Sequence, residues 1–117
     1  MYNYLLLDPA GLEYIPVVKT QELPTGERLF VTIGDRSIIV FNIAGGYYAI
    51  GDVCSHDGNY LDDAPVEGDE VVCPRHGAHF DLRSGKAISL PAVVDIPSYP
   101  VRIIEDYIQV GIPKTNG

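Results

Sequence analysis

Tryptophan is absent from the 117 residues, methionine occurs only as Met1, and cysteine occurs only as Cys54 and Cys73. Two cysteines are too few for the disulfide framework of a small secreted domain. Basic residues are also scarce, because 8 Lys and Arg stand against 16 Asp and Glu and give a net charge of −8. This balance argues against binding to nucleic acid or to an anionic membrane surface, since both need clustered Lys and Arg.

Long hydrophobic runs are missing as well. No segment approaches the roughly 18 apolar residues of a spanning helix. The first residues lack a positively charged leader, and the apolar run Leu5–Leu7 is too short for a secretory signal. We therefore expect a soluble, cytoplasmic protein without a membrane partner, folded as a single domain over residues 1–117.

The chain is rich in short runs of β-branched and aromatic residues separated by turn residues. This rhythm predicts an all-β fold, an antiparallel sandwich or barrel. The predicted strands are 14–20, 28–33, 36–43, 47–52, 71–73, 78–82, 86–89, 101–105 and 107–112. The second to fourth of them predict a meander, and Pro16 restricts the first to an edge. No helix is expected.

Two segments that join these strands carry the two cysteines together with histidines. The first has the pattern Cys-x-His at Cys54 and His56, and the second has Cys-x-x-His at Cys73 and His76. Thiolate and neutral imidazole are ligands for zinc, copper or iron–sulfur iron, whereas hard cations prefer carboxylates. The pattern therefore predicts a metal site built from two loops.

Simpler explanations of this pattern fit less well. A Cys54–Cys73 disulfide leaves both histidines unexplained. Structural zinc modules usually pair Cys with Cys and His with His, but here each loop is mixed. Blue copper needs one Cys, two His and a weak axial group such as Met, so it leaves the second Cys unexplained, and Met1 is the only methionine in the chain.

A two-iron cluster accounts for the mixture of ligands. In this interpretation Cys54 and Cys73 bind one iron, and His56 and His76 bind the other, as in a Rieske centre. Gly58 and Gly77 would let backbone N–H groups approach the sulfides.

The stretch "CSHDG … CPRHGAHFDLRSGKA" resembles the signature of the Rieske [2Fe–2S] family. The resemblance is specific within Cys54–Gly85, and in strand pattern it extends from about Ile15 to Ile112. It implies the Rieske fold, with a small cluster-binding subdomain at about residues 53–90.

Some residues of high-potential Rieske proteins are missing. Asn59 and Arg75 occupy the places of two cysteines that form a disulfide in cytochrome bc complexes. Ala78 and Phe80 occupy the places of a serine and a tyrosine that donate hydrogen bonds to sulfur. The resemblance is thus closest to the soluble Rieske ferredoxins.

Such a ferredoxin is an electron carrier and not an enzyme. The resemblance implies that a flavin-dependent reductase donates single electrons, which pass to a terminal oxygenase. Two alternatives remain open: the Rieske-like small subunit of an assimilatory nitrite reductase, and a zinc-stabilised binding module without a redox role.

Three further features have both a functional and a structural interpretation. His79 is expected to be a strand residue beside the second loop and not a ligand. Gly85 is expected to serve a hairpin turn only. An acidic segment could dock basic partners or could simply be a solvated loop; its carboxylates are Asp52, Asp57, Asp62, Asp63, Glu67, Asp69 and Glu70.

The residues at positions 78 and 80 predict a low midpoint potential. Hydrogen bonds to cluster sulfurs stabilise the reduced state, so the loss of two such donors lowers the potential. We expect a value on the order of −150 mV in a redox titration, and a midpoint above about +100 mV would contradict the prediction.

Overall fold

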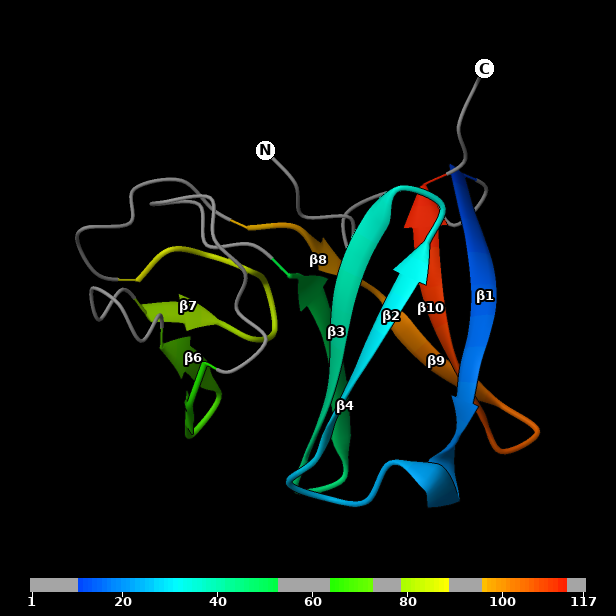
Figure 1. The fold of residues 1–117 in the computed structure, drawn as a ribbon, viewed down its shortest axis with the longest axis horizontal. Coiled ribbons are helices and arrows are strands. Elements are labelled where there is room, and N and C mark those ends of the chain that lie inside the picture. The colour runs from blue at the N-terminus through cyan, green and yellow to red at the C-terminus, as the bar shows by residue number, and fades with distance from the viewer. Residues whose placement is uncertain (1–10, 53–63, 73–78, 89–95, 114–117) are drawn as a thin grey trace.

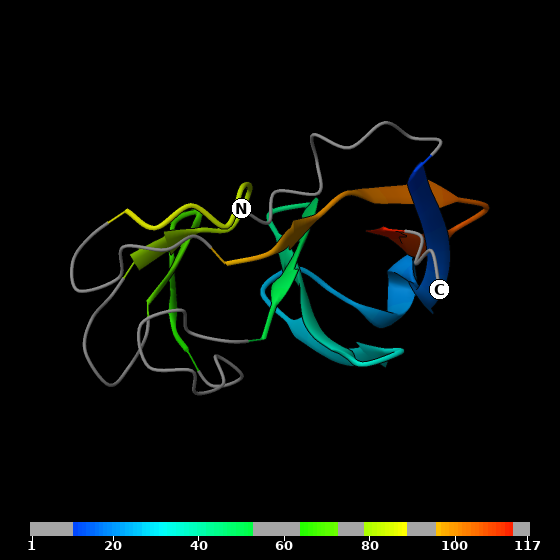
Figure 2. The ribbon, with the colours of Figure 1, turned by 90° about the horizontal axis from the view of Figure 1, so that it is seen from above.

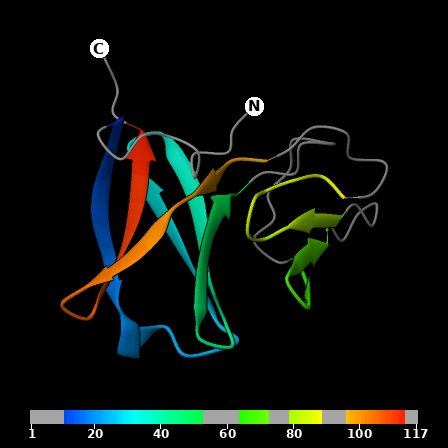
Figure 3. The ribbon, with the colours of Figure 1, turned by 180° about the vertical axis from the view of Figure 1, so that it is seen from behind.

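The computed structural model describes residues 11–52, 64–72, 79–88 and 96–113. These residues form three antiparallel sheets in a body of 39 × 35 × 21 Å. Along the long axis a small sheet lies at one end, a four-stranded sheet lies in the middle and a sheet made from the two ends of the chain lies at the other (Figure 1). Figure 3 shows the same order from behind.

The terminal sheet has the order β1-β10-β9. It contains β1 (Leu12–Lys19), β9 (Val101–Ile104) and β10 (Tyr107–Pro113). Pro16 lies in the edge strand β1, as predicted, and the register with β10 shifts between Pro16 and Val18. A 3-10 turn, η3 (Thr20–Glu22), follows β1 and was not predicted.

The central sheet has the order β2-β3-β4-β8. It contains β2 (Arg28–Ile33), β3 (Arg36–Ile43), β4 (Gly46–Gly51) and β8 (Ser98–Tyr99). The predicted meander is confirmed, because β2, β3 and β4 pair in sequence order. Ala44 and Gly45 both have positive φ, of 52° and 89°, as the two central residues of a type I′ hairpin turn require.

The small sheet has the order β5-β6-β7. It contains β5 (Val66–Glu67), β6 (Glu70–Val72) and β7 (His79–Asp81). Neither β5 nor β8 was predicted. The strand expected at 86–89 is reduced, within the described residues, to an isolated bridge between Phe80 and Ala87.

Strand β3 connects two hydrophobic clusters because both of its faces are buried. Ile38 and Val40 pack in a cluster with β10 residues such as Ile108 and Val110. Ile39 and Phe41 point the other way, into a cluster that includes residues of the small sheet and the segments around it. The small-sheet side of that second cluster consists of Ala64, Val71, Phe80, Leu82 and Ile96. The central sheet is therefore covered on both sides, as the view from above indicates (Figure 2).

The turn after β7 is hydrogen-bonded to the residues around the start of β8, the last strand of the central sheet. Ile96 N–H donates to the Gly85 carbonyl at 2.8 Å, and the Ser98 hydroxyl donates to the Arg83 carbonyl at 3.2 Å. Gly85 has a φ of +73°, and a Cβ at this position would lie 2.1 Å from the Ile96 carbonyl oxygen. The expectation that Gly85 serves a turn only was wrong, since the missing side chain also lets the two segments approach.

Replacing this glycine should therefore be costly. We expect Gly85→Ala to lower the free energy of unfolding by more than about 2 kcal/mol, because it adds a backbone clash to the left-handed strain. Gly68 is a matched control with a φ of +64°, and a Cβ added there would have no atom within 4 Å. Gly68→Ala should cost only about 1–2 kcal/mol. Urea unfolding of both variants measures the difference, and equal losses would contradict the role assigned to Gly85.

Candidate metal centre

The four predicted ligands lie outside the described residues. Cys54 and His56 fall within 53–63, and Cys73 and His76 fall within 73–78. Gly58, Asn59, Arg75, Gly77 and Ala78 also lie there. The structure does describe the residues that flank both segments, and these determine where each segment starts and ends.

The ends of 73–78 are neighbours in the small sheet. Val72 ends β6, His79 begins β7, and the two residues are paired across the antiparallel ladder. The predicted ligands Cys73 and His76 thus belong to the connection of a hairpin whose strands are fixed by pairing.

The second end of 53–63 reaches the same place. Ala64, which follows this segment, is fully buried in the cluster with Val71 and Phe80. The next residue, Pro65, accepts a hydrogen bond from Val72 N–H at 2.9 Å. The described residues that follow the first predicted ligand segment are therefore hydrogen-bonded to the residue that precedes the second.

A third segment starts beside them. Ile88 N–H donates to the His79 carbonyl at 2.8 Å, so 89–95 begins next to β7. The start of 53–63 lies on the central sheet instead, where Asp52 N–H donates to the Ser37 carbonyl at 2.9 Å. The small sheet thus collects the ends of three segments, two of which carry the predicted ligands.

His79 is confirmed as a strand residue beside the second ligand segment. Its Nδ1 lies 2.8 Å from Glu70 Oε1, and about a third of each side chain is exposed. Glu70 and His79 lie on adjacent strands, diagonal to each other across the ladder, where side chains on the same face can still reach each other. The contact engages one ring nitrogen of His79 with a carboxylate.

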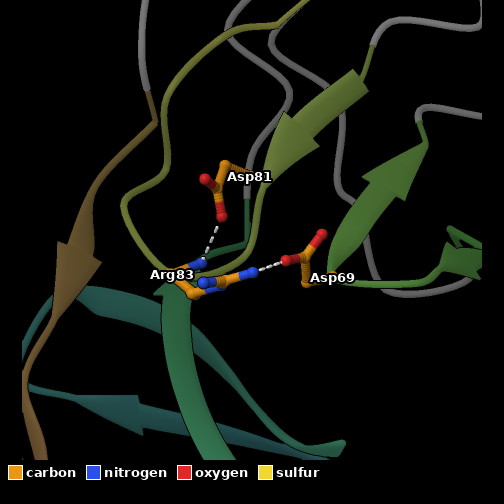
Figure 4. Close-up of polar contacts among 3 residues, drawn as sticks. All are labelled: Asp69, Asp81 and Arg83. Carbon is orange, nitrogen blue, oxygen red and sulfur yellow. Dashed lines mark hydrogen bonds and ion pairs between the residues drawn. The ribbon is translucent and has the colours of Figure 1, made fainter.

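An ion pair joins the turn before β6 to the turn after β7. Arg83 donates through Nη2 to the Asp69 carboxylate, and its backbone N–H donates to Asp81 Oδ1 at 2.8 Å (Figure 4). The Asp69 carbonyl also accepts from Leu82 N–H at 2.8 Å. These contacts stabilise the end of the β6–β7 pair that lies away from Val72 and His79.

Phe80 lies in the core on the small-sheet side. Its side chain is fully buried among Val71, Leu82 and Ile96. A phenyl ring has no hydroxyl that could donate a hydrogen bond.

Sequence reasoning missed the contacts of Glu70 and Arg28. Glu70 precedes the second Cys/His motif by three residues, and the strand alternation across the hairpin could have paired it with His79. Arg28 Nη1 donates to the Ala64 carbonyl at 2.7 Å, a contact across 36 residues that no local pattern indicates.

The donor set can be compared with the group it is expected to bind. Within 11–52, 64–72, 79–88 and 96–113, no three His, Cys, Asp or Glu side chains come together as a metal site. The thiolates and imidazoles of 53–63 and 73–78 are soft and borderline ligands, which suit iron–sulfur iron. Two Cys and two His divided between two segments are the donor set of a Rieske two-iron cluster, so the residue types fit this group.

No helix in the described part of the chain is both long enough and apolar enough to cross a membrane.

Comparisons with known proteins agree with this assignment. The family model of the Rieske [2Fe–2S] domain matches residues 13–100. The ferredoxin component of the naphthalene 1,2-dioxygenase system of Pseudomonas aeruginosa is 33% identical over 78% of this chain and 88% of its own length. The 3-phenylpropionate/cinnamic acid dioxygenase ferredoxin subunit of Escherichia coli K12 is 37% identical over 80% and 88%.

Solved structures agree in fold. The ferredoxin of carbazole 1,9a-dioxygenase from Nocardioides aromaticivorans has a TM-score of 0.78 and 29% identity, over 86% of this chain and 98% of that one. A complex of reduced oxygenase and oxidised ferredoxin in carbazole 1,9a-dioxygenase gives a TM-score of 0.79 at 25% identity, over 89% and 97%. A putative nitrite reductase small subunit from Mycobacterium tuberculosis gives 0.78 at 24% identity, over 89% and 98%, which shows the fold alone.

The predicted all-β Rieske fold is confirmed by these matches. The chain belongs to the Rieske [2Fe–2S] family, as one of its ferredoxins, which carry electrons on a two-iron, two-sulfide cluster and are not catalysts themselves.

Proposed function

We propose that this chain is the ferredoxin component of an aromatic ring-hydroxylating dioxygenase system, taking electrons from a flavin-dependent reductase and delivering them to a terminal oxygenase. The observation that carries the proposal is the match to dioxygenase ferredoxins over 88% of their own length. The solved complex of a similar ferredoxin with its oxygenase supports the acceptor. The donor rests on the composition of dioxygenase systems in general.

In this proposal the ligands are Cys54 and Cys73 on one iron and His56 and His76 on the other. The mixed Cys/His pattern of the two segments supports it, and three of the four described flanks lie together, because Pro65, Val72 and His79 are linked by a backbone hydrogen bond and strand pairing. When bound, the cluster accepts and releases one electron at a time.

Residues that flank the ligand segments in the chain are anchored in the hydrophobic core. Ala64, which follows 53–63, is fully buried in one cluster with Val71 and Phe80 from the strands on either side of 73–78. Rigid support of this kind fixes ligand positions, which limits the rearrangement that accompanies a change of charge. Phe80 contributes packing and no hydroxyl, which supports the low midpoint potential.

Two carboxylates of the acidic segment have side-chain partners in the described residues. Asp69 forms an ion pair with Arg83, and Glu70 Oε1 lies 2.8 Å from His79 Nδ1, whereas Glu67 is exposed. Asp57, Asp62 and Asp63 lie outside the described residues. A docking role for this segment remains part of the proposal.

The proposal also includes a cytoplasmic location. It includes a single domain over 1–117 with a cluster-binding subdomain at about 53–90.

The ligand assignment can be tested with two histidines three positions apart. We expect His76→Ala to abolish the visible absorbance and the EPR signal of the reduced cluster, with iron falling from about two per chain to near zero. His79→Ala is the matched control and should keep both signals, because His79 bonds to Glu70.

Cluster loss in the His79 variant, or an intact cluster in the His76 variant, would refute the assignment. A colourless unmodified protein that contains zinc and no iron would instead establish the zinc-stabilised module.

The partner assignment needs a separate measurement. We expect the dithionite-reduced protein to be reoxidised rapidly, by one electron per chain, when it is mixed with the terminal oxygenase of a ring-hydroxylating dioxygenase under anaerobic conditions. Stopped-flow absorbance follows the reaction, and the His76→Ala variant serves as the cluster-free control. Reoxidation by the catalytic subunit of a nitrite reductase, with no response to the oxygenase, would favour the nitrite reductase alternative.

A further inference from the structure

Arg28 connects the central sheet to the segment that leads into the small sheet. It begins β2, and its Nη1 donates a hydrogen bond of 2.7 Å to the carbonyl oxygen of Ala64. Its guanidinium also lies over the ring of Phe41, 4.8 Å from the centroid. Phe41 is the direct partner of Arg28 on β3, so the arginine is supported by its own sheet while it reaches the next one.

The surroundings make this contact stronger than a surface one. Both Phe41 and Ala64 are at most 1% exposed and belong to the same hydrophobic cluster. A hydrogen bond from a guanidinium to a carbonyl is charge-assisted, and partial burial limits competition from water. The stacked ring adds a cation–π contact that fixes the plane of the guanidinium.

The acceptor of this hydrogen bond lies next to a predicted ligand segment in the chain. Ala64 directly follows the segment that carries Cys54 and His56. The next residue, Pro65, accepts from Val72 N–H at 2.9 Å, and Val72 directly precedes Cys73. Arg28 therefore holds Ala64 against the central sheet, next to the hydrogen bond that links the residues after 53–63 to the residue before 73–78.

We propose that Arg28 is a positioning residue for the iron–sulfur site: by holding the Ala64 carbonyl against the central sheet, it sets how the Cys54–His56 segment is placed relative to the Cys73–His76 segment. This inference rests on the proposed ligand assignment. Arg28 itself is not a ligand. Its effect is exerted through the backbone of Ala64 and Pro65.

The test compares three variants of the full-length protein that contains its cluster. Arg28→Ala removes the hydrogen bond and the stacked cation. Arg28→Lys keeps the charge but lacks the planar fork that bonds and stacks at once. Arg102→Ala is the matched control, because Arg102 also stacks on an aromatic ring, Tyr14 at 3.9 Å, and bonds to Gln109, but does so on the terminal sheet.

Three properties are measured: the half-life of the visible absorbance in the presence of a chelator, the EPR g values of the reduced state, and the midpoint potential. For Arg28→Ala we expect the half-life to shorten by about tenfold, the loss that one charge-assisted hydrogen bond can cause. We also expect broadened, shifted g values and a shifted midpoint. Arg28→Lys should recover these properties only in part, and Arg102→Ala should match the unmodified protein.

Two results would overturn the inference. One is an Arg28→Ala protein with a lower melting temperature but with the half-life, g values and midpoint of the Arg102→Ala control, since that outcome describes a purely structural residue. The other is an Arg102→Ala protein whose half-life, g values and midpoint shift as much as those of Arg28→Ala, which would assign the effect to the loss of any stacked arginine. Absence of a two-iron EPR signal from the unmodified protein would refute the proposed function instead, and would be recognised before any variant is compared.

Discussion

Burial of β3 on both faces is the constraint on which the rest of this structure depends. Ile38, Ile39, Val40 and Phe41 are consecutive and at most 1% exposed. Because side chains alternate along a strand, two of them must be covered from one side and two from the other. The terminal sheet covers the first pair, and the small sheet with its neighbouring segments covers the second. The small sheet therefore shares a hydrophobic cluster with the central sheet.

This arrangement explains how three short strands can support an iron–sulfur site. A sheet of two- and three-residue strands has too little pairing to be stable alone. Here Val71, Phe80 and Leu82 are buried against the central sheet, and Arg28 adds a polar bridge to Ala64. The contact of Glu70 with His79 and the ion pair of Asp69 with Arg83 then hold neighbouring parts of the small sheet together. Apolar packing attaches the small sheet to the central sheet, and the polar contacts of Arg28, Glu70 and Asp69 fix its position.

The sequence predicted the long strands well because their information is local. The bounds of β2 and β3 agree with the prediction, since alternation and the turn residues between them mark both ends. The two-residue strands β5 and β8 were missed because they exist only through their partners, β6 and β4. The ligand pattern could be recognised from spacing, whereas the contact of Arg28 with Ala64 joins residues 36 positions apart and could not be inferred without the fold.

The hydrogen bond from Gly51 N–H to the Pro97 carbonyl, 2.9 Å long, has an evolutionary consequence. It lies where the chain leaves β4 and where it returns to β8, and these two strands are paired neighbours. Everything between Asp52 and Ile96 is thus a single excursion whose entrance and exit are side by side. Changes inside this excursion that keep the side chains packed on β3, namely Ala64, Val71, Phe80 and Leu82, leave the pairing of β4 with β8 in place. Natural selection can therefore adapt the redox properties and partner choice of such a protein while inheriting its scaffold unchanged.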